Sequence, residues 1–212
     1  MELVIEKKNF KVLIKGLNMI FTALLIVLSC LLLFFGALIV FASLISENFV
    51  LNLIEGGKFS ASFNFSGFEL FLAEPAIKKF HYDKGIIVLL LFIVLIYISI
   101  IFYIIILVKK FLNSIMQGEI FTLSNSKRIE KVAYCFVSLS FVINTIQTYL
   151  IYALSQLFTL EQFMESANWI KSVSYHFFGV NWSMFLCGLI IWTIGRIFRY
   201  GSFLQEEFDA TL

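Results

Sequence analysis

Residues 85–108 read GIIVLLLFIVLIYISIIFYIIILV and contain no charged side chain. A helix needs about 20 apolar residues to cross a hydrocarbon core of roughly 30 Å. Three further stretches, 16–46, 132–160 and 172–195, are also free of charged residues. Because a bilayer offers the backbone no hydrogen-bond partners, each span is expected to be a helix. The sequence therefore predicts an all-α membrane protein, a four-helix bundle with spans at about 17–45, 86–108, 132–160 and 173–195.

Composition supports a single membrane domain covering residues 1–212. The chain is 60% hydrophobic and 14% charged, whereas soluble domains carry about 25% charged residues. The net charge of +2 is too small to indicate direct binding of nucleic acid. All three cysteines fall inside predicted spans and lack the spacing of a metal site or a disulfide framework. We predict no metal and no cofactor.

The distribution of Lys and Arg predicts the orientation in the membrane. Eleven of them lie in the N-terminal segment, the segment between spans two and three, and the tail at 196–212; the other five lie in the loops at 47–84 and 161–171. Cytoplasmic flanks collect basic residues. We therefore expect a multi-pass protein of the cell (cytoplasmic) membrane with both termini in the cytoplasm.

The outer loop at 47–84 has a pattern typical of strands. Two apolar runs, Phe49–Ile54 and Phe59–Phe65, flank the pair Gly56-Gly57, which is a turn signal, and Phe68–Leu72 can add a further short strand. This pattern predicts a small extracytoplasmic β-hairpin cap on the bundle. A lid that shields the helix ends is the favoured interpretation, and a surface that meets a ligand or partner is the alternative.

Residues 109–131 are expected to form a cytoplasmic helical hairpin between spans two and three. Helical spacing continues past Lys110, and Gly118 stands where glycine often ends a helix. Thr122 or Ser124 can cap the next helix. Span three, which follows, is the polar one, and its polar residues lie close to one face. Such groups usually hydrogen-bond to neighbouring helices, and the lining of a small polar pocket is the alternative; the residues are Ser140, Asn144, Gln147, Thr148 and Ser155.

Groups with obvious chemistry are scarce. No span interior holds Asp, Glu, Lys or Arg, which would mark a proton relay or ion path. The chain also lacks the common nucleophile, zinc and phosphate-loop motifs. We therefore expect a protein that is not an enzyme, and ion-coupled transport is disfavoured further.

Two predicted cytoplasmic segments are unusual: GEIFTLSNSKRI at 118–129 and GSFLQEEFDATL at 201–212. In them the chain resembles a bacterial family of four-span membrane proteins, domain of unknown function 2975. The first family pattern is matched by Gly118, Phe121, Thr122 and Asn125, with Arg128 near its basic position. The tail pattern is matched by Gly201, Leu204, Gln205, Glu207, Asp209 and Thr211, with Glu206 between them.

The resemblance implies a regulatory role with a small helix-turn-helix regulator as partner, because members of this family are often encoded beside one. The acidic residues Glu206, Glu207 and Asp209 and the basic residues Lys127, Arg128 and Lys131 are predicted on the same side of the membrane. Closure of the bundle by the tail folding against the hairpin is the favoured interpretation. A surface for a cytoplasmic partner is the alternative.

The leading hypothesis is a non-enzymatic regulatory membrane protein that contacts such a DNA-binding regulator at the cytoplasmic face. One alternative is a bacteriocin-immunity or self-protection protein that acts through the outer loop. Another is a passive small-molecule carrier or channel that uses the polar face of span three. Small residues in span four also allow a homo-oligomer.

Overall fold

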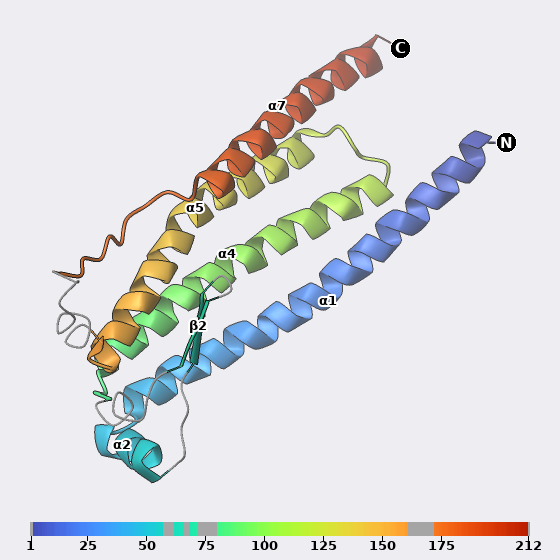
Figure 1. Ribbon diagram of the computed structural model, residues 1–212. Coiled ribbons are helices and arrows are strands. Elements are labelled where there is room, and N and C mark those ends of the chain that lie inside the picture. Colours follow the sequence, from blue (N-terminus) through green and yellow to red (C-terminus); the bar gives the residue numbers. More distant parts are fainter. Residues whose placement is uncertain (1, 57–61, 66–67, 72–79, 161–171, 212) are drawn as a thin grey trace. The chain divides into compact units, whose positions relative to one another are not determined.

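The computed structural model describes residues 2–56, 62–65, 68–71, 80–160 and 172–211. The described residues form five helices and a pair of short strands (Figure 1). In chain order these are α1 (Glu2–Leu44), α2 (Glu47–Gly56), β1 (Ser62–Phe65), β2 (Phe68–Phe71), α4 (Lys84–Met116), α5 (Leu123–Leu157) and α7 (Trp182–Ala210).

Four of these helices are long and apolar enough to cross a membrane. The qualifying stretches are Phe10–Leu44, Lys84–Met116, Leu123–Leu157 and Trp182–Phe208. Large apolar side chains on them are widely exposed, which in water would form an unusually large apolar surface. Lipid as the surrounding solvent removes that penalty. The prediction of a helical, multi-pass membrane protein with four spans is confirmed.

The chain divides into two compact units. The first consists of Met1–Phe34, Leu95–Ile143 and Val180–Leu212, and the second of Phe35–Val94 and Asn144–Gly179. The candidate site described below lies entirely in the first unit. The assignment of residues 1–212 to one domain stays a prediction.

Hydrogen bonds to backbone carbonyls connect the helices in the second unit. The Tyr82 hydroxyl donates to the Ala42 carbonyl of α1 at 3.2 Å, and the Tyr149 hydroxyl donates to the Ile86 carbonyl of α4 at 3.3 Å. The His81 amide donates to the Leu157 carbonyl, the last residue of α5, at 2.7 Å. The chain entering α4 is thereby connected to both α1 and α5.

The β-hairpin predicted across Gly56-Gly57 is wrong. Phe49–Ile54, its expected first strand, lies in helix α2, and Gly56 ends that helix. The apolar residues at positions 49, 50, 53 and 54 fit a helical period as well as a strand, and Glu47 in the first turn favours a helix N-terminus. The strands that do pair are β1 and β2, antiparallel, with Ser62 opposite Phe71. Residues 57–61, 66–67 and 72–79 of the predicted loop lie outside the described residues.

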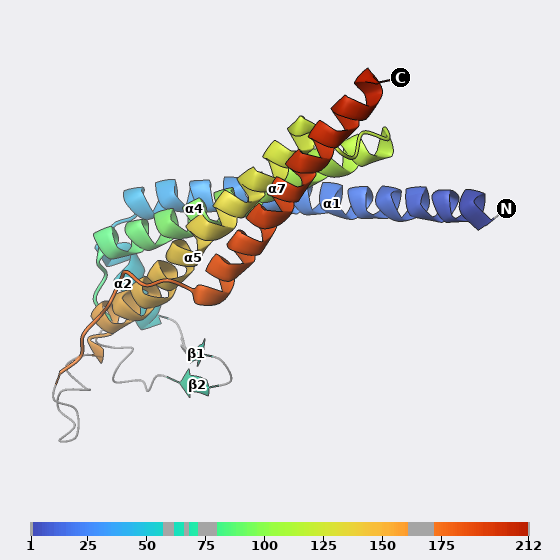
Figure 2. The ribbon, with the colours of Figure 1, turned by 90° about the horizontal axis from the view of Figure 1, so that it is seen from above.

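Span four also differs from its prediction at 173–195. Residues 172–181 are not helical, and α7 follows this stretch (Figure 2). Helix α7 begins at Trp182 with Asn181 as its N-cap, and the Asn181 side chain accepts from the Met184 amide. At the other end α7 continues to Ala210, so most of the predicted tail at 196–212 is an extension of the same helix. Polar side chains of α5 replace part of the hydrogen bonding that a helix at 172–181 would have supplied.

Candidate functional site

The turn between α4 and α5 is built by two residues of the first motif. Gly118 follows the end of α4 with a φ of +87°, a backbone conformation that favours glycine. Thr122 precedes α5, and its hydroxyl accepts from the Asn125 amide at 3.2 Å, which satisfies one of the free amides at the start of the helix. The predicted helical hairpin, with glycine ending one helix and threonine capping the next, is confirmed.

Asn125 lies at the centre of the turn and is completely buried. Its amide nitrogen donates to the Glu119 carbonyl at 2.7 Å, the Ile120 carbonyl at 3.1 Å and the Ser114 hydroxyl oxygen at 3.1 Å. The Ser114 hydroxyl in turn donates to the Glu119 carbonyl at 3.1 Å. The two amide protons of Asn125 are thus shared among three acceptors, of which the Ser114 hydroxyl is buried. This network fixes the path of the chain from α4 into α5.

Arg128 extends the same network toward α4. Its Nη1 donates to the side-chain oxygen of Asn125 at 2.8 Å and to the Lys110 carbonyl at 3.0 Å. The guanidinium therefore spans from the start of α5 to the last turns of α4. Because an ionised donor strengthens a hydrogen bond, these contacts hold Asn125 in the orientation that serves the turn.

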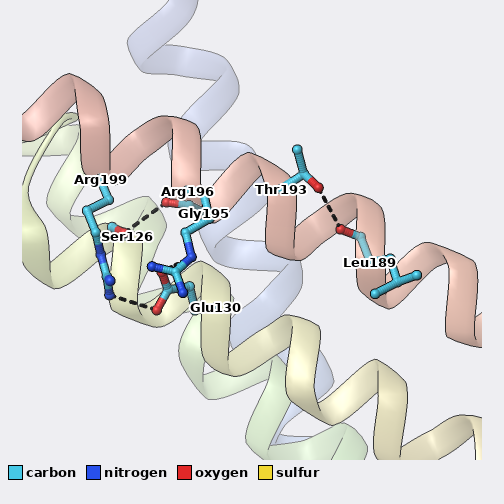
Figure 3. Close-up of polar contacts among 7 residues, drawn as sticks. All are labelled: Ser126, Glu130, Leu189, Thr193, Gly195, Arg196 and Arg199. Atoms are coloured by element: carbon cyan, nitrogen blue, oxygen red, sulfur yellow. Dashed lines mark hydrogen bonds and ion pairs between the residues drawn. The ribbon is translucent and has the colours of Figure 1, made fainter.

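An acid on α5 and two bases on α7 connect these helices (Figure 3). Glu130 is nearly buried, and its Oε2 lies 2.9 Å from Nη2 of Arg199, while its Oε1 lies 3.7 Å from Nε of Arg196. One turn earlier on α5, the buried Ser126 hydroxyl donates to the Gly195 carbonyl at 2.9 Å. Arg199 is the more shielded of the two bases, so its charge-assisted hydrogen bond is the stronger contact.

Glycines of α7 allow the close approach that these bonds need. A Cβ on Gly195 would lie 2.9 Å from Cγ of Glu130, and one on Gly188 would lie 3.1 Å from the Ala133 carbonyl oxygen. A Cβ on Gly201 would lie 2.8 Å from the ring of Phe121. Glycine at these three positions lets the backbone of α7 reach α5 and the turn, as small residues do at membrane helix contacts.

Phe121 joins the two sequence motifs. Its ring packs against Gly201 and lies 5.2 Å, between centroids, from the ring of Phe198 on α7. Phe198 also makes an edge contact of 5.8 Å with Phe111 of α4. The structure thus brings Gly201 of the tail motif onto the turn formed by the first motif.

The rest of the tail motif does not join this contact. Ser202 is buried, but every residue from 203 to 208 is exposed, including Leu204, Gln205, Glu206 and Glu207. We call residues 203–208 the projecting end of α7. Thr211 stands at the end of the helix, where its hydroxyl donates to the Phe208 carbonyl at 2.8 Å. Asp209 is helical, and its side chain lies outside the described part of the chain.

The acidic tail and the basic residues of the hairpin, predicted on the same side of the membrane, are not joined through Glu206 or Glu207 in the described part of the chain. Among the described residues, no ion pair joins Glu206 or Glu207 to Lys127, Arg128 or Lys131. The observed ion pairs run the other way, from an acid on the hairpin side, Glu130, to bases at the start of the predicted tail. The physical reason is burial, because Glu130 faces α7, whereas Glu206 and Glu207 are exposed on the part of α7 that follows the Gly201 contact.

The polar face predicted on span three contacts the non-helical stretch at 172–181. In the first unit, the backbone carbonyl of the buried Ser140 accepts from the Asn181 amide at 2.8 Å. In the second unit, the Thr148 hydroxyl donates to the His176 carbonyl at 3.2 Å, and the Asn144 side chain lies against Gly179. Gln147 is exposed, and Ser155 is buried with its hydroxyl unpaired among the described residues.

Sequence reasoning missed Ser114, Ser126, Glu130, Gly195 and Arg199, all of which carry contacts of this site. A pattern that points to them exists: positions 126, 130, 133, 137 and 140 share one face of α5 and hold only Ser, Glu, Ala, Val and Ser. A single acid on a face of small residues indicates a close helix contact with a basic partner.

A family model described as Protein of unknown function (DUF2975) matches residues 72–212, about two thirds of the chain. The chain belongs to the DUF2975 family. The resemblance drawn from the two sequence motifs is thereby confirmed. The DUF2975 match includes α4, α5, α7 and the whole network between them, and it leaves out α1, α2 and both strands. No curated protein and no solved structure matches the chain.

Proposed function

We propose that this DUF2975 protein is a non-enzymatic regulatory membrane protein that holds a small helix-turn-helix regulator at the cytoplasmic face. The observation that carries the proposal is the projecting end of α7, which continues beyond the last contact with α5 and the turn. It belongs to the motif through which the chain resembles the family. Such a regulator is the partner that the resemblance implies.

The shape of the projecting end suits a protein partner. Its Phe203, Leu204 and Phe208, together with Tyr200 just before it, follow a helical period and are each about half exposed or more. They form a row of large apolar side chains that the described residues cover only in part. An amphipathic helix that lays such a row into a groove is a common mode of recognition. The helix is also fastened at its base by Gly201 and Arg199, so little ordering is needed on binding.

Charge supports a DNA-binding protein as that partner. Glu206 and Glu207 are exposed and unpaired among the described residues of the chain. Helix-turn-helix proteins present Lys and Arg to the phosphates of DNA, and two carboxylates on a helix attract the same surface. Binding to the membrane protein and binding to DNA then compete, so the regulator acts on its operator only when it is released.

The cytoplasmic location is part of the same proposal. The Lys and Arg bias of eleven to five supports placing both termini and the α4–α5 turn in the cytoplasm. The contact between Phe121 and Gly201 keeps the turn and the base of the projecting end on one side.

Co-purification tests the proposal. The full chain is co-expressed with a small helix-turn-helix regulator of the kind often encoded beside members of this family, and purified in mild detergent, alone and with the regulator's operator DNA added. We expect the wild-type protein to retain the regulator and to release it to DNA. The double change Glu206→Gln/Glu207→Gln should weaken retention and make it less sensitive to salt.

The matched control is Ile190→Ala, because Ile190 is similarly exposed on α7 but lies far from the projecting end. It should leave retention unchanged. Failure of the wild-type protein to retain the regulator, or equal retention after removal of residues 203–212, would contradict the proposal.

A further inference from the structure

A groove of about 290 Å³ lies between α4, α5 and α7 within the first unit. Each helix contributes three side chains, and eight of the nine are apolar, among them Phe111, Ile129 and Ile194. The ninth is Arg128. The exposed surface of the groove is entirely apolar, so Arg128 lines it with the carbon atoms of its side chain and none of its nitrogens faces into it. An apolar groove with one cation beside it fits an amphiphile with an apolar chain and an anionic head.

Arg128 has hydrogen-bonding capacity left for such a head. A guanidinium carries five N–H donors, and Arg128 uses Nη1 for Asn125 and Lys110. Among the residues that the structure describes, nothing accepts from its Nη2 or Nε. These two nitrogens form one edge of the planar guanidinium, and the spacing of their N–H groups matches two oxygens of a phosphate. The bonds through Nη1 hold that edge in place before any ligand arrives.

The lysines near the groove favour binding of a negatively charged group. Lys109 and Lys110 on α4 and Lys127 and Lys131 on α5 lie within about one turn of groove residues. No ion pair joins any of these lysines to an acid in the described parts of the chain. Apolar spans give way to basic residues at the level where lipid headgroups lie, and basic pockets between membrane helices bind anionic headgroups.

We propose that this groove is a binding site for one anionic phospholipid, with an acyl chain between α4, α5 and α7 and the phosphate on Nη2 and Nε of Arg128. The lysines near the groove favour an anionic lipid over a second copy of the chain, since a second copy would bring the same positive charges against them. The site is separate from the projecting end, and it requires no regulator.

Native mass spectrometry of the full chain in mild detergent tests the proposal. The probes are phosphatidylglycerol and phosphatidylcholine with identical acyl chains. We expect one phosphatidylglycerol to be retained with an affinity about tenfold above that for phosphatidylcholine, and Arg128→Gln to abolish this preference. Ile194→Trp fills the groove while it leaves Arg128 intact, and it should reduce retention of both lipids.

Leu189→Trp is the matched control, because Leu189 is 43% exposed on the same helix, Ile194 is 42% exposed, and only Ile194 lines the groove. It should keep the wild-type retention. If Arg128→Gln does not fold, Ile194→Trp against Leu189→Trp decides the matter. Equal retention of the two lipids by the wild type overturns the proposal. Retention of inorganic phosphate alone in place of lipid also overturns it. A lipid-free dimer that Ile194→Trp disrupts would do the same.

Discussion

Asn125 determines the structure of the α4–α5 turn because the backbone there has carbonyls that no helix satisfies. The last carbonyls of a helix and those of a tight turn lack partners in the chain itself. One buried amide supplies the donors for Glu119 and Ile120 and accepts from Arg128. Its requirement is specific, since only a side chain that both donates and accepts at this place satisfies all these groups.

Asn125→Asp is therefore predicted to be strongly destabilising although it is nearly isosteric. The carboxylate keeps the contact with Arg128 but has no protons for the carbonyls of Glu119 and Ile120. The Glu119 carbonyl then keeps only its bond from Ser114, and the Ile120 carbonyl loses its side-chain donor. We expect the free energy of unfolding to fall by roughly 2–4 kcal/mol. Unfolding of the purified protein by denaturing detergent in mixed micelles measures the change.

Asn52→Asp is the control for that substitution, since Asn52 is exposed on α2 and receives the same chemical change. Its effect should stay within about 0.5 kcal/mol. Equal effects at positions 52 and 125 would show that the amide protons of Asn125 contribute little to stability.

Helix α7 owes its position to three glycines that remove side chains at its contacts with α5 and the turn. At Gly195 the neighbouring atoms include the backbone nitrogen of Glu130, 3.3 Å from an added Cβ, and backbone cannot rotate away as a side chain can. The same approach brings Ser126 and Glu130 to their partners on α7.

Gly195→Ala is predicted to separate α5 and α7 and to weaken the Arg199–Glu130 ion pair. We expect a loss of about 1–3 kcal/mol, the usual cost of overpacking a close contact. Gly16→Ala on α1 is the control, because nothing lies within 4 Å of the added Cβ. Alanine favours a helix over glycine by about 1 kcal/mol, so this control should be neutral or stabilising. If Gly195→Ala leaves the free energy of unfolding unchanged in the same mixed-micelle titration, the proposed close contact is contradicted.

Helices and strands can be predicted from the sequence where hydrophobic length determines them. The prediction fails where local hydrogen bonds determine where an element begins or which type it is. The four spans and the α4–α5 hairpin were predictable because uncharged stretches of this length leave few other structures in lipid. The start of α7 at Trp182 was not, since hydropathy does not reveal that Thr145 and Thr148 donate to the carbonyls of Phe177 and His176. The strand predicted at Phe49–Ile54 failed because short apolar runs fit both periods.

The candidate site shows the same division. Gly118, Thr122 and Asn125 were found from local turn and capping patterns and from the motif. Glu130 was missed because its partners are about 70 residues away, and no local pattern shows which basic residues will face it. Long-range pairing in this chain is set by which helix faces meet, and that information comes only with the packed structure.

At the scale of the whole molecule, the DUF2975 match covers α4, α5 and α7 and does not include the first 71 residues. The network of Asn125, Arg128, Glu130 and Arg199 lies wholly in the matched part. Any function shared across DUF2975 is therefore expected in α4, α5 and α7. The proposed regulator contact and the proposed lipid groove both meet that condition.

The orientation of the whole chain can be tested by single cysteines in a variant whose Cys30, Cys135 and Cys187 are replaced by alanine. The basic bias predicts that Ser124→Cys, beside the α4–α5 turn, reacts with a membrane-impermeant maleimide only after the cells are opened. Ser62→Cys in β1 should react in intact cells. Ser99→Cys, in the middle of the apolar α4 span, should stay unlabelled in both conditions and serves as the control.

Since Phe121 packs on Gly201, the label at position 124 also reports the side of the projecting end. Labelling of Ser124→Cys in intact cells would place that end outside, where it meets no DNA-binding protein, and the regulatory proposal would be lost while the lipid groove would stand.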